Sequence, residues 1–113
     1  MKYDLEDRTF EFARQVRVFV KRLPRTISNL QDVPQLVSAS GSVGANYIEA
    51  NEALGKNFRM RIRISRKESK ESRYWLRLLD VMDDGGLIQE RDNLIQESTE
   101  LMLILGAILK KSE

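Results

Sequence analysis

Six positively charged side chains recur along one stretch of the sequence at the spacing of a helix face. They alternate at intervals of three and four residues: Arg59, Arg63, Arg66, Lys70, Arg73 and Arg77. Residues at these intervals share one side of an α-helix, so a helix here would carry a continuous row of cations. Such a row can contact successive phosphates, and neutralising phosphates releases counterions. The pattern predicts a surface that binds RNA or DNA.

Two further observations bear on this surface. Residues 8–25 hold six basic groups and one acid, and Arg14, Arg17 and Lys21 join the predicted nucleic-acid-binding set. The sequence has no helix-turn-helix signal, zinc-finger spacing or aromatic-rich sheet, so binding would follow shape and charge and be salt-sensitive. The alternative is a solvated face that pairs with Glu68, Glu71 and the acids of residues 80–113, in the same or a neighbouring subunit. The sequence leaves both interpretations open.

The remaining polar candidates favour structural roles. Glu49, Glu68 and Glu71 could be imagined as an acid–base pair or a carboxylate metal site, but di-iron bundles use histidine ligands and this sequence has no histidine. We expect these glutamates to satisfy Arg, Tyr or Trp partners, and Asn46 to fix helix register by a hydrogen bond between helices. With no cysteine either, we expect no metal, no cofactor and no catalysis.

Two aromatic residues stand beside the cations. Tyr74 and Trp75 could stack on nucleic-acid bases. Large aromatics followed by Leu76 and Leu79 more often belong to a core or an interface, so Trp75 is assigned to the structural set.

Four helices must position these residues. The apolar periodicity predicts helices over about 4–23, over 32–54 with Asp32 as N-cap, from the 54–57 turn to about 83 with Gly85-Gly86 as the stop, and over about 90–110. Short connections make consecutive helices antiparallel. We predict an all-α, up-down-up-down antiparallel four-helix bundle that forms a single domain over residues 1–113.

Small residues predict where two of these helices meet. The run from Ser38 to Asn46 contains only small or short side chains, and the third helix carries serines at 65, 69 and 72 on its packing side. Small side chains let helix backbones approach closely, so we expect the two stretches to face each other.

The charge distribution and the C-terminal helix bear on partners. The formal net charge is only +2, but residues 56–77 carry nine basic groups and two acids, whereas residues 80–113 carry three basic groups and eight acids. The run from Leu101 to Leu109 is apolar all round, which favours a subunit interface over an unusually apolar core helix. It is too short to span a bilayer, and residues 1–7 lack the apolar core of a signal peptide, so we expect a cytoplasmic protein without a membrane role.

Two motifs also resemble a known family. Residues 42–50 (SVGANYIEA) and residues 65–76 (SRKESKESRYWL), with Phe58 between them, resemble the bacterial four-helix-bundle family whose founding members are encoded in intervening sequences of 23S ribosomal RNA genes. The same family includes the accessory protein of diversity-generating retroelements. The resemblance covers nearly the whole chain. It implies an up-down bundle, a homopentamer with a basic surface, and a nucleic acid or a reverse transcriptase as partner.

These observations combine into one functional expectation with one alternative. We expect a non-catalytic, oligomeric four-helix-bundle scaffold whose basic surface binds RNA or DNA electrostatically. The alternative is a protein–protein interaction adaptor without any nucleic-acid role, motivated by the apolar end of the last helix and the acidic 80–100 region.

Overall fold

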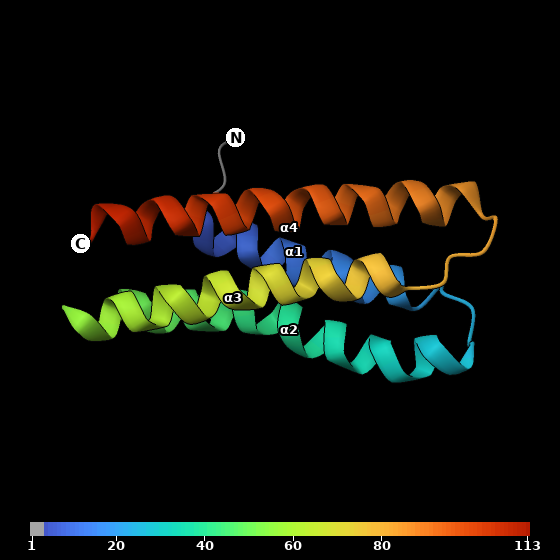
Figure 1. Ribbon diagram of the computed structural model, residues 1–113, viewed down its shortest axis with the longest axis horizontal. Coiled ribbons are helices and arrows are strands. Elements are labelled where there is room, and N and C mark those ends of the chain that lie inside the picture. Colours follow the sequence, from blue (N-terminus) through green and yellow to red (C-terminus); the bar gives the residue numbers. More distant parts are fainter. Residues whose placement is uncertain (1–3) are drawn as a thin grey trace.

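The structure, a computed structural model, describes residues 4–113 and consists of four antiparallel helices (Figure 1). They are α1 (Leu5–Val20), α2 (Ile27–Asn51), α3 (Lys56–Leu78) and α4 (Gly85–Lys111). Each helix packs on the next in the chain, and α1 also packs on α4, so α1 lies diagonally across from α3 and α2 across from α4. The predicted all-α up-down bundle is confirmed. The assignment of residues 1–113 to a single domain stays a prediction, and residues 1–3 lie outside the described range.

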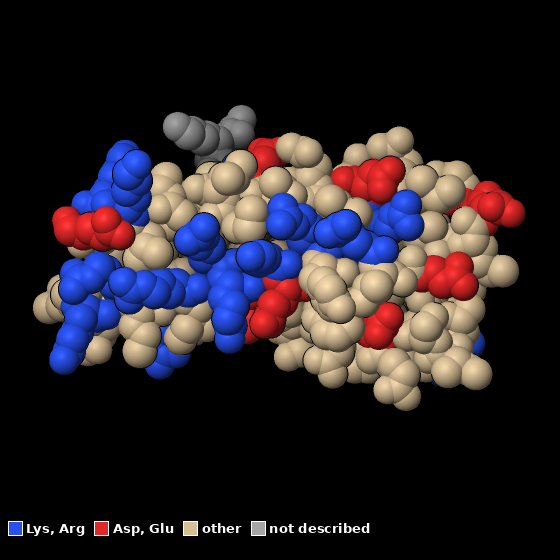
Figure 2. Space-filling view, in the orientation of Figure 1, with Lys and Arg blue, Asp and Glu red and all other residues tan. Residues whose placement is uncertain are grey.

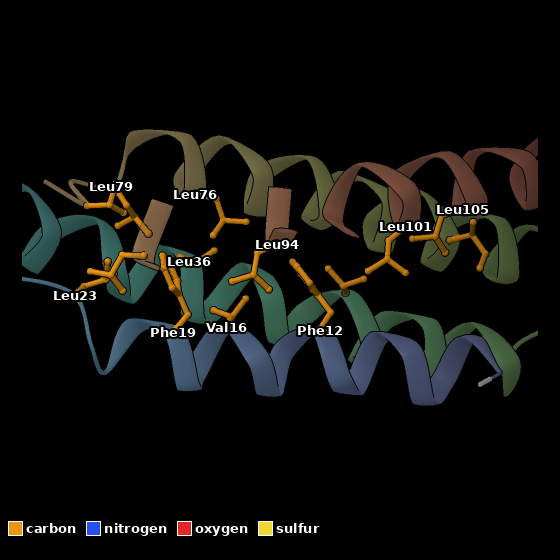
Figure 3. Close-up of a cluster of buried hydrophobic side chains, with 14 of the residues drawn as sticks. Phe12, Val16, Phe19, Leu23, Leu36, Leu76, Leu79, Leu94, Leu101 and Leu105 are labelled. Atoms are coloured by element: carbon orange, nitrogen blue, oxygen red, sulfur yellow. The ribbon is translucent and has the colours of Figure 1, made fainter. Parts of the chain in front are cut away.

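One apolar core runs through the bundle (Figure 3). Each helix contributes residues at the predicted spacing, among them Phe12, Val16 and Phe19 from α1. Because these side chains leave water on folding, the core is the main source of stability. Leu54, which was expected to lie within the second helix, lies beyond the end of α2 and is 87% exposed. The other core residues are Leu23, Leu36, Val43, Ala50, Ile62, Leu76, Leu79, Val81, Leu87, Leu94, Leu101, Leu105 and Leu109.

The prediction was wrong about where α2 begins. The helix starts at Ile27 rather than near Asp32, because Thr26 caps it and accepts a 3.1 Å hydrogen bond from the Asn29 backbone N–H. Pro34 therefore lies inside the helix. A proline removes one helical hydrogen bond and bends a helix. In Figure 1 the first part of α2 splays away from α3.

The prediction was also wrong about the connection between α3 and α4. Gly85 and Gly86 do not stop α3, which ends earlier at Leu78; they are the first two residues of α4. Asp84 makes this possible, because its carboxylate accepts a 3.0 Å hydrogen bond from the Leu87 backbone N–H and so caps the helix. The α1 helix is similarly capped by Asp4 and ends three residues before the expected Leu23.

The expected close approach between α2 and α3 is present. The Ser65 hydroxyl donates a 2.7 Å hydrogen bond to the Val43 carbonyl oxygen across the two helices. Ser69 and Ser72 are fully buried and donate to carbonyl oxygens one turn earlier in α3, so neither hydroxyl is left without an acceptor. Three serines thus let the backbones of α2 and α3 pack closely without a polar penalty.

Candidate nucleic-acid interface

The six predicted cations of α3 form what we call the α3 cationic row: Arg59, Arg63, Arg66, Lys70, Arg73 and Arg77. All six lie within the 23-residue helix, which holds their spacing rigidly. Arg59 and Arg73 are partly buried and the other four are exposed. Figure 2 shows Lys and Arg side chains as a band along α3. Most of the Asp and Glu side chains on this face lie towards the end of the molecule where α4 begins. The row is a real feature of the surface and not only of the sequence.

A groove of about 500 Å³ lies between the row and α4. Its α3 wall is cationic, with Arg63, Arg66, Lys67, Lys70 and Arg73, and its α4 wall is apolar, with Met102 and Leu109. The Arg66 guanidinium lies across Gly106 of α4, where a Cβ atom would come 3.5 Å from its Nε. This is an ordinary van der Waals separation, so Arg66 packs against α4 at a distance that a small side chain would also fit.

The cations of the row are largely unpaired. Within residues 4–113, Arg63, Arg66, Lys70, Arg73 and Arg77 make no hydrogen bond or ion pair. Arg59 donates only a 3.4 Å hydrogen bond to the Ser112 carbonyl oxygen near the C-terminus. The alternative of a face paired with acids of the same subunit therefore does not describe these side chains.

The predicted cations of α1 lie on a different part of the molecule. Because α1 is diagonal to α3, Arg14, Arg17 and Lys21 do not extend the α3 cationic row. Arg14 forms an ion pair with Glu11, with 2.6 Å between Nη2 and Oε1. Arg17 donates to the Ala13 carbonyl oxygen at 3.0 Å and lies over Gly41 of α2. The structure therefore divides the predicted binding set into two separate groups.

Two other cations, Arg8 of α1 and Arg22 just beyond its end, bind acids of α4. Arg8 donates hydrogen bonds of 2.7–2.9 Å to Glu97 and Glu100, and Arg22 forms an ion pair with Glu90. The Glu97 hydrogen bond is the main reason that the pKa of the Arg8 guanidinium is raised. These pairs fasten α1 to α4. The sequence shows that both basic and acidic residues are present, but it does not show which cation pairs with which carboxylate.

The glutamates do not find the partners that were expected. Glu68 lies 3.7 Å from Lys67, its neighbour in sequence, rather than against an arginine or aromatic side chain. Burial, followed by repulsion from Glu71, raises the pKa of Glu68. Glu71 and Glu49 are exposed and form no ion pair within the described residues. Their exposure means that water can satisfy both carboxylates.

Asn46 links three groups. Its side-chain N–H₂ donates to both the carbonyl and the hydroxyl oxygen of Ser42 at 2.9 Å, and its Oδ1 accepts a 3.1 Å hydrogen bond from Arg61 of α3. Arg61 lies outside the α3 cationic row, on the side of α3 that meets α2. This contact joins α2 to α3 near the turn that connects them.

Trp75 and Tyr74 have different environments. Trp75 is partly buried and packs against the core, as expected, whereas Tyr74 is 55% exposed and so does not belong to the core. The two rings meet edge-on, with centroids 5.1 Å apart. Exposure of Tyr74 follows from its helical position, because it comes four residues after Lys70 and three before Arg77, on the cationic side.

Sequence reasoning missed Asn29, which is only 2% exposed. Its side chain donates 2.9 Å hydrogen bonds to the carbonyl oxygens of Pro24 and Asp80, and accepts one from the Asp80 backbone N–H. Asn29 thereby joins the α1–α2 connection to the α3–α4 connection. Thr26, three residues earlier, was the available signal, because threonine before a helical run is an N-cap pattern that places Asn29 in the first turn.

Among residues 4–113 no group of three His, Cys, Asp or Glu side chains is arranged to hold a metal ion. Within the same residues, no helix combines the length and apolarity needed to cross a bilayer. No protein-family model and no curated protein matches the sequence.

One solved structure is similar over nearly the whole chain. It is the crystal structure of a protein of unknown function from the S23 ribosomal protein family of Bacteroides thetaiotaomicron. The two chains are 27% identical, and the match covers 95% of this chain and 99% of the other with a TM-score of 0.76. This similarity confirms the family resemblance that the two central motifs indicated.

Proposed function

We propose that this protein is a non-catalytic, oligomeric scaffold that binds RNA or DNA through the α3 cationic row. The observation that carries the proposal is the contrast between two sets of cations. Arg8 and Arg14 of α1, and Arg22 just after it, are paired with carboxylates, whereas none of the six cations of the row has an acidic partner within the described residues. Unpaired cations held close together on one helix repel each other, and an anion that bridges them removes this repulsion.

The row suits a phosphate backbone better than it suits isolated anions. Its cations follow each other about once per helical turn, roughly every 5.4 Å. A polyanion can engage several of them at once, and each contact releases condensed counterions. The sequence has no helix-turn-helix signal or zinc-finger spacing that would read base edges. Recognition would therefore depend on charge and shape, and affinity would fall steeply with salt.

Oligomerisation would multiply this effect. The apolar second half of α4 exposes Leu103, of which 62% is accessible, and the exposed Ala107 follows one turn later. Exposed apolar residues at helical spacing are typical of an interface between subunits. Each added subunit would bring another cationic row, so individually weak contacts would combine into tight binding.

A protein–protein interaction adaptor is the second candidate function. A groove of about 690 Å³ between α1 and α2 favours it. Its floor consists of small residues such as Gly41 and Gly44, and it is flanked by Phe10 and Ile48, which are 68% and 45% exposed. A groove of this kind can receive an apolar side chain or helix face of another protein.

The test compares two variants that lose the same charge. In one, Arg63, Arg66, Lys70 and Arg73 of α3 are changed to Gln; in the other, Arg14, Arg17, Lys21 and Arg25 on the α1 side are changed to Gln. Nuclease-treated protein is titrated with labelled RNA and DNA at several salt concentrations. We expect the α3 variant to lose binding and the α1 variant to keep most of it, with circular dichroism unchanged for both.

The salt dependence counts the contacts. If the four α3 side chains each contact one phosphate of a duplex, the slope of log Kobs against log salt concentration becomes shallower by about 3.6 in the α3 variant. Equal binding by the α3 variant and the unmodified protein would exclude the row as the site. Absence of any binding at low salt, together with a stoichiometric protein partner that survives nuclease, would favour the adaptor.

A further inference from the structure

Tyr74 lies on the same side of α3 as the cationic row. It follows Lys70 by four residues and precedes Arg77 by three, which are the intervals that bring helical side chains together. More than half of its surface, 55%, is exposed to water. A tyrosine at this position places an accessible aromatic ring among the cations.

Trp75 limits the movement of this exposed ring. Trp75 is partly buried against the core, and the Tyr74 ring meets it edge-on at a centroid distance of 5.1 Å. An edge-to-face pair is a favourable aromatic arrangement, and Tyr74 keeps 55% of its surface accessible within it. A ring that is held in place, and flanked by cations, is the arrangement that proteins use to stack a nucleic-acid base.

The α4 wall of the groove points to the same kind of ligand. Met102 and Leu109 of α4 line the groove together with the cations Arg66 and Lys70 of α3. A duplex keeps its base faces stacked inside and presents phosphates and sugars, so an apolar wall offers it little. A single strand presents base faces as well as phosphates, and can use both walls.

We propose that the α3 cationic row receives a single-stranded nucleic acid, with phosphates on the row and one base stacked on Tyr74. This inference rests on the proposed function and adds the strand state of the ligand and a residue that the charge argument does not include. It also predicts a spectroscopic signal, because Trp75 is the only tryptophan in the chain and lies beside the stacking ring.

The experiment titrates the full chain with a 12-nucleotide oligo(dT), a 12-nucleotide oligo(U) and a 12-base-pair duplex, followed by Trp75 fluorescence and by anisotropy of the labelled strand. We expect tighter binding of either single strand than of the duplex, with a change in tryptophan emission. Tyr74→Ala should weaken single-strand binding about 5- to 150-fold, and Tyr74→Phe should retain it, because both rings stack. Since Tyr74 carries no charge, the salt slope should stay the same in both variants.

The outcomes separate this inference from the proposed function. Equal affinity for duplex and single strands, with no effect of Tyr74→Ala, would overturn the inference and leave the electrostatic function standing. No binding of any of the three probes at low salt would overturn both. Preference for oligo(U) would identify RNA as the source of the strand, and preference for oligo(dT) would identify DNA; either result supports the inference. The substituted side chain is exposed, so Tyr74→Ala should fold.

Discussion

Thr9 of α1 lies so close to Gly44 of α2 that a Cβ atom at position 44 would stand 2.9 Å from the threonine Oγ1. Thr9 is 1% exposed, and its hydroxyl already donates a 2.9 Å hydrogen bond to the Glu6 carbonyl oxygen. Because Thr9 is buried and its hydroxyl is hydrogen-bonded, its side chain has no room to move away from a Cβ atom at position 44. Gly44 is thus the point that sets the distance between α1 and α2.

Gly44→Ala should therefore destabilise the protein although alanine is the better helix former. The gain in helix propensity is about 1 kcal/mol, and overpacking a tight contact costs about 1–3 kcal/mol. We expect a net loss of about 1 kcal/mol in the free energy of unfolding, measured by urea denaturation. Gly106→Ala is the matched control, because its Cβ would meet Arg66 Nε only at 3.5 Å. That variant should be more stable than the unmodified protein by up to about 1 kcal/mol. A change of the same sign in the free energy of unfolding for Gly44→Ala and Gly106→Ala would refute this account.

Asn29→Ala should be among the most destabilising single changes. It would leave the carbonyl oxygens of Pro24 and Asp80 and the Asp80 N–H without the partners they now have. Each unsatisfied buried group costs about 1–3 kcal/mol, so we expect a loss of about 3 kcal/mol in thermal or urea unfolding. Asn51→Ala, at an exposed position at the end of α2, should change stability by less than about 0.5 kcal/mol. Similar losses in both variants would contradict the assigned role.

Glu68→Gln should stabilise the protein at neutral pH and not in acid. Burial and the neighbouring Glu71 raise the pKa of Glu68 above its ordinary value of 4.5, so the folded state carries a penalty for the charged carboxylate. The penalty is fully present above the raised pKa and disappears as the pH falls below 4.5, where both states are protonated. The melting temperature of the variant should therefore exceed that of the unmodified protein at pH 7, and the difference should vanish near pH 4.

The pH comparison for Glu68→Gln needs a control variant, because lowering the pH also protonates other carboxylates. Hydrogen bonds from Arg14 and Gln15 hold the pKa of Glu11 at about 2, and those from Gln96 and Arg8 lower the pKa of Glu100. These groups contribute stability above their ordinary pKa that is lost as the pH falls, in every variant alike. Glu49→Gln removes an exposed carboxylate of α2 and should leave the melting temperature close to that of the unmodified protein at each pH. A pH-independent effect of Glu68→Gln would show that burial of the charge is not its cause.

The fold was predictable because periodicity reports which side of a helix is buried. The positions of Phe12, Val16 and Phe19, and of the three serines of α3, followed from spacing alone. Helix ends were less predictable. They depend on single hydrogen bonds, and the caps made by Thr26 and Asp84 outweighed the usual effects of a proline and of paired glycines. Propensity is a weak tendency that one good cap can override.

The site was predictable as a pattern but not as an electrostatic environment. Spacing placed Arg63, Arg66 and Lys70 in one row, whatever lies opposite them. Whether a cation is free depends on the helix across from it, and Arg8 meets Glu97 from 89 residues away in the sequence. No local pattern could reveal that α4 neutralises α1 while leaving the α3 cationic row unpaired.

Because Asn29 binds both Pro24 and Asp80, the backbone amide of Asp80 reports on a contact with a distant part of the sequence. The Asp80 N–H belongs to the α3–α4 connection, yet its acceptor is a side chain of α2, 51 residues away. Asp80 would exchange its amide hydrogen with solvent only when this contact opens. The exchange rate of this single amide would therefore report how often the contact between Asn29 and Asp80 opens. Because the same side chain also donates to the Pro24 carbonyl oxygen, we expect the two connections to open together.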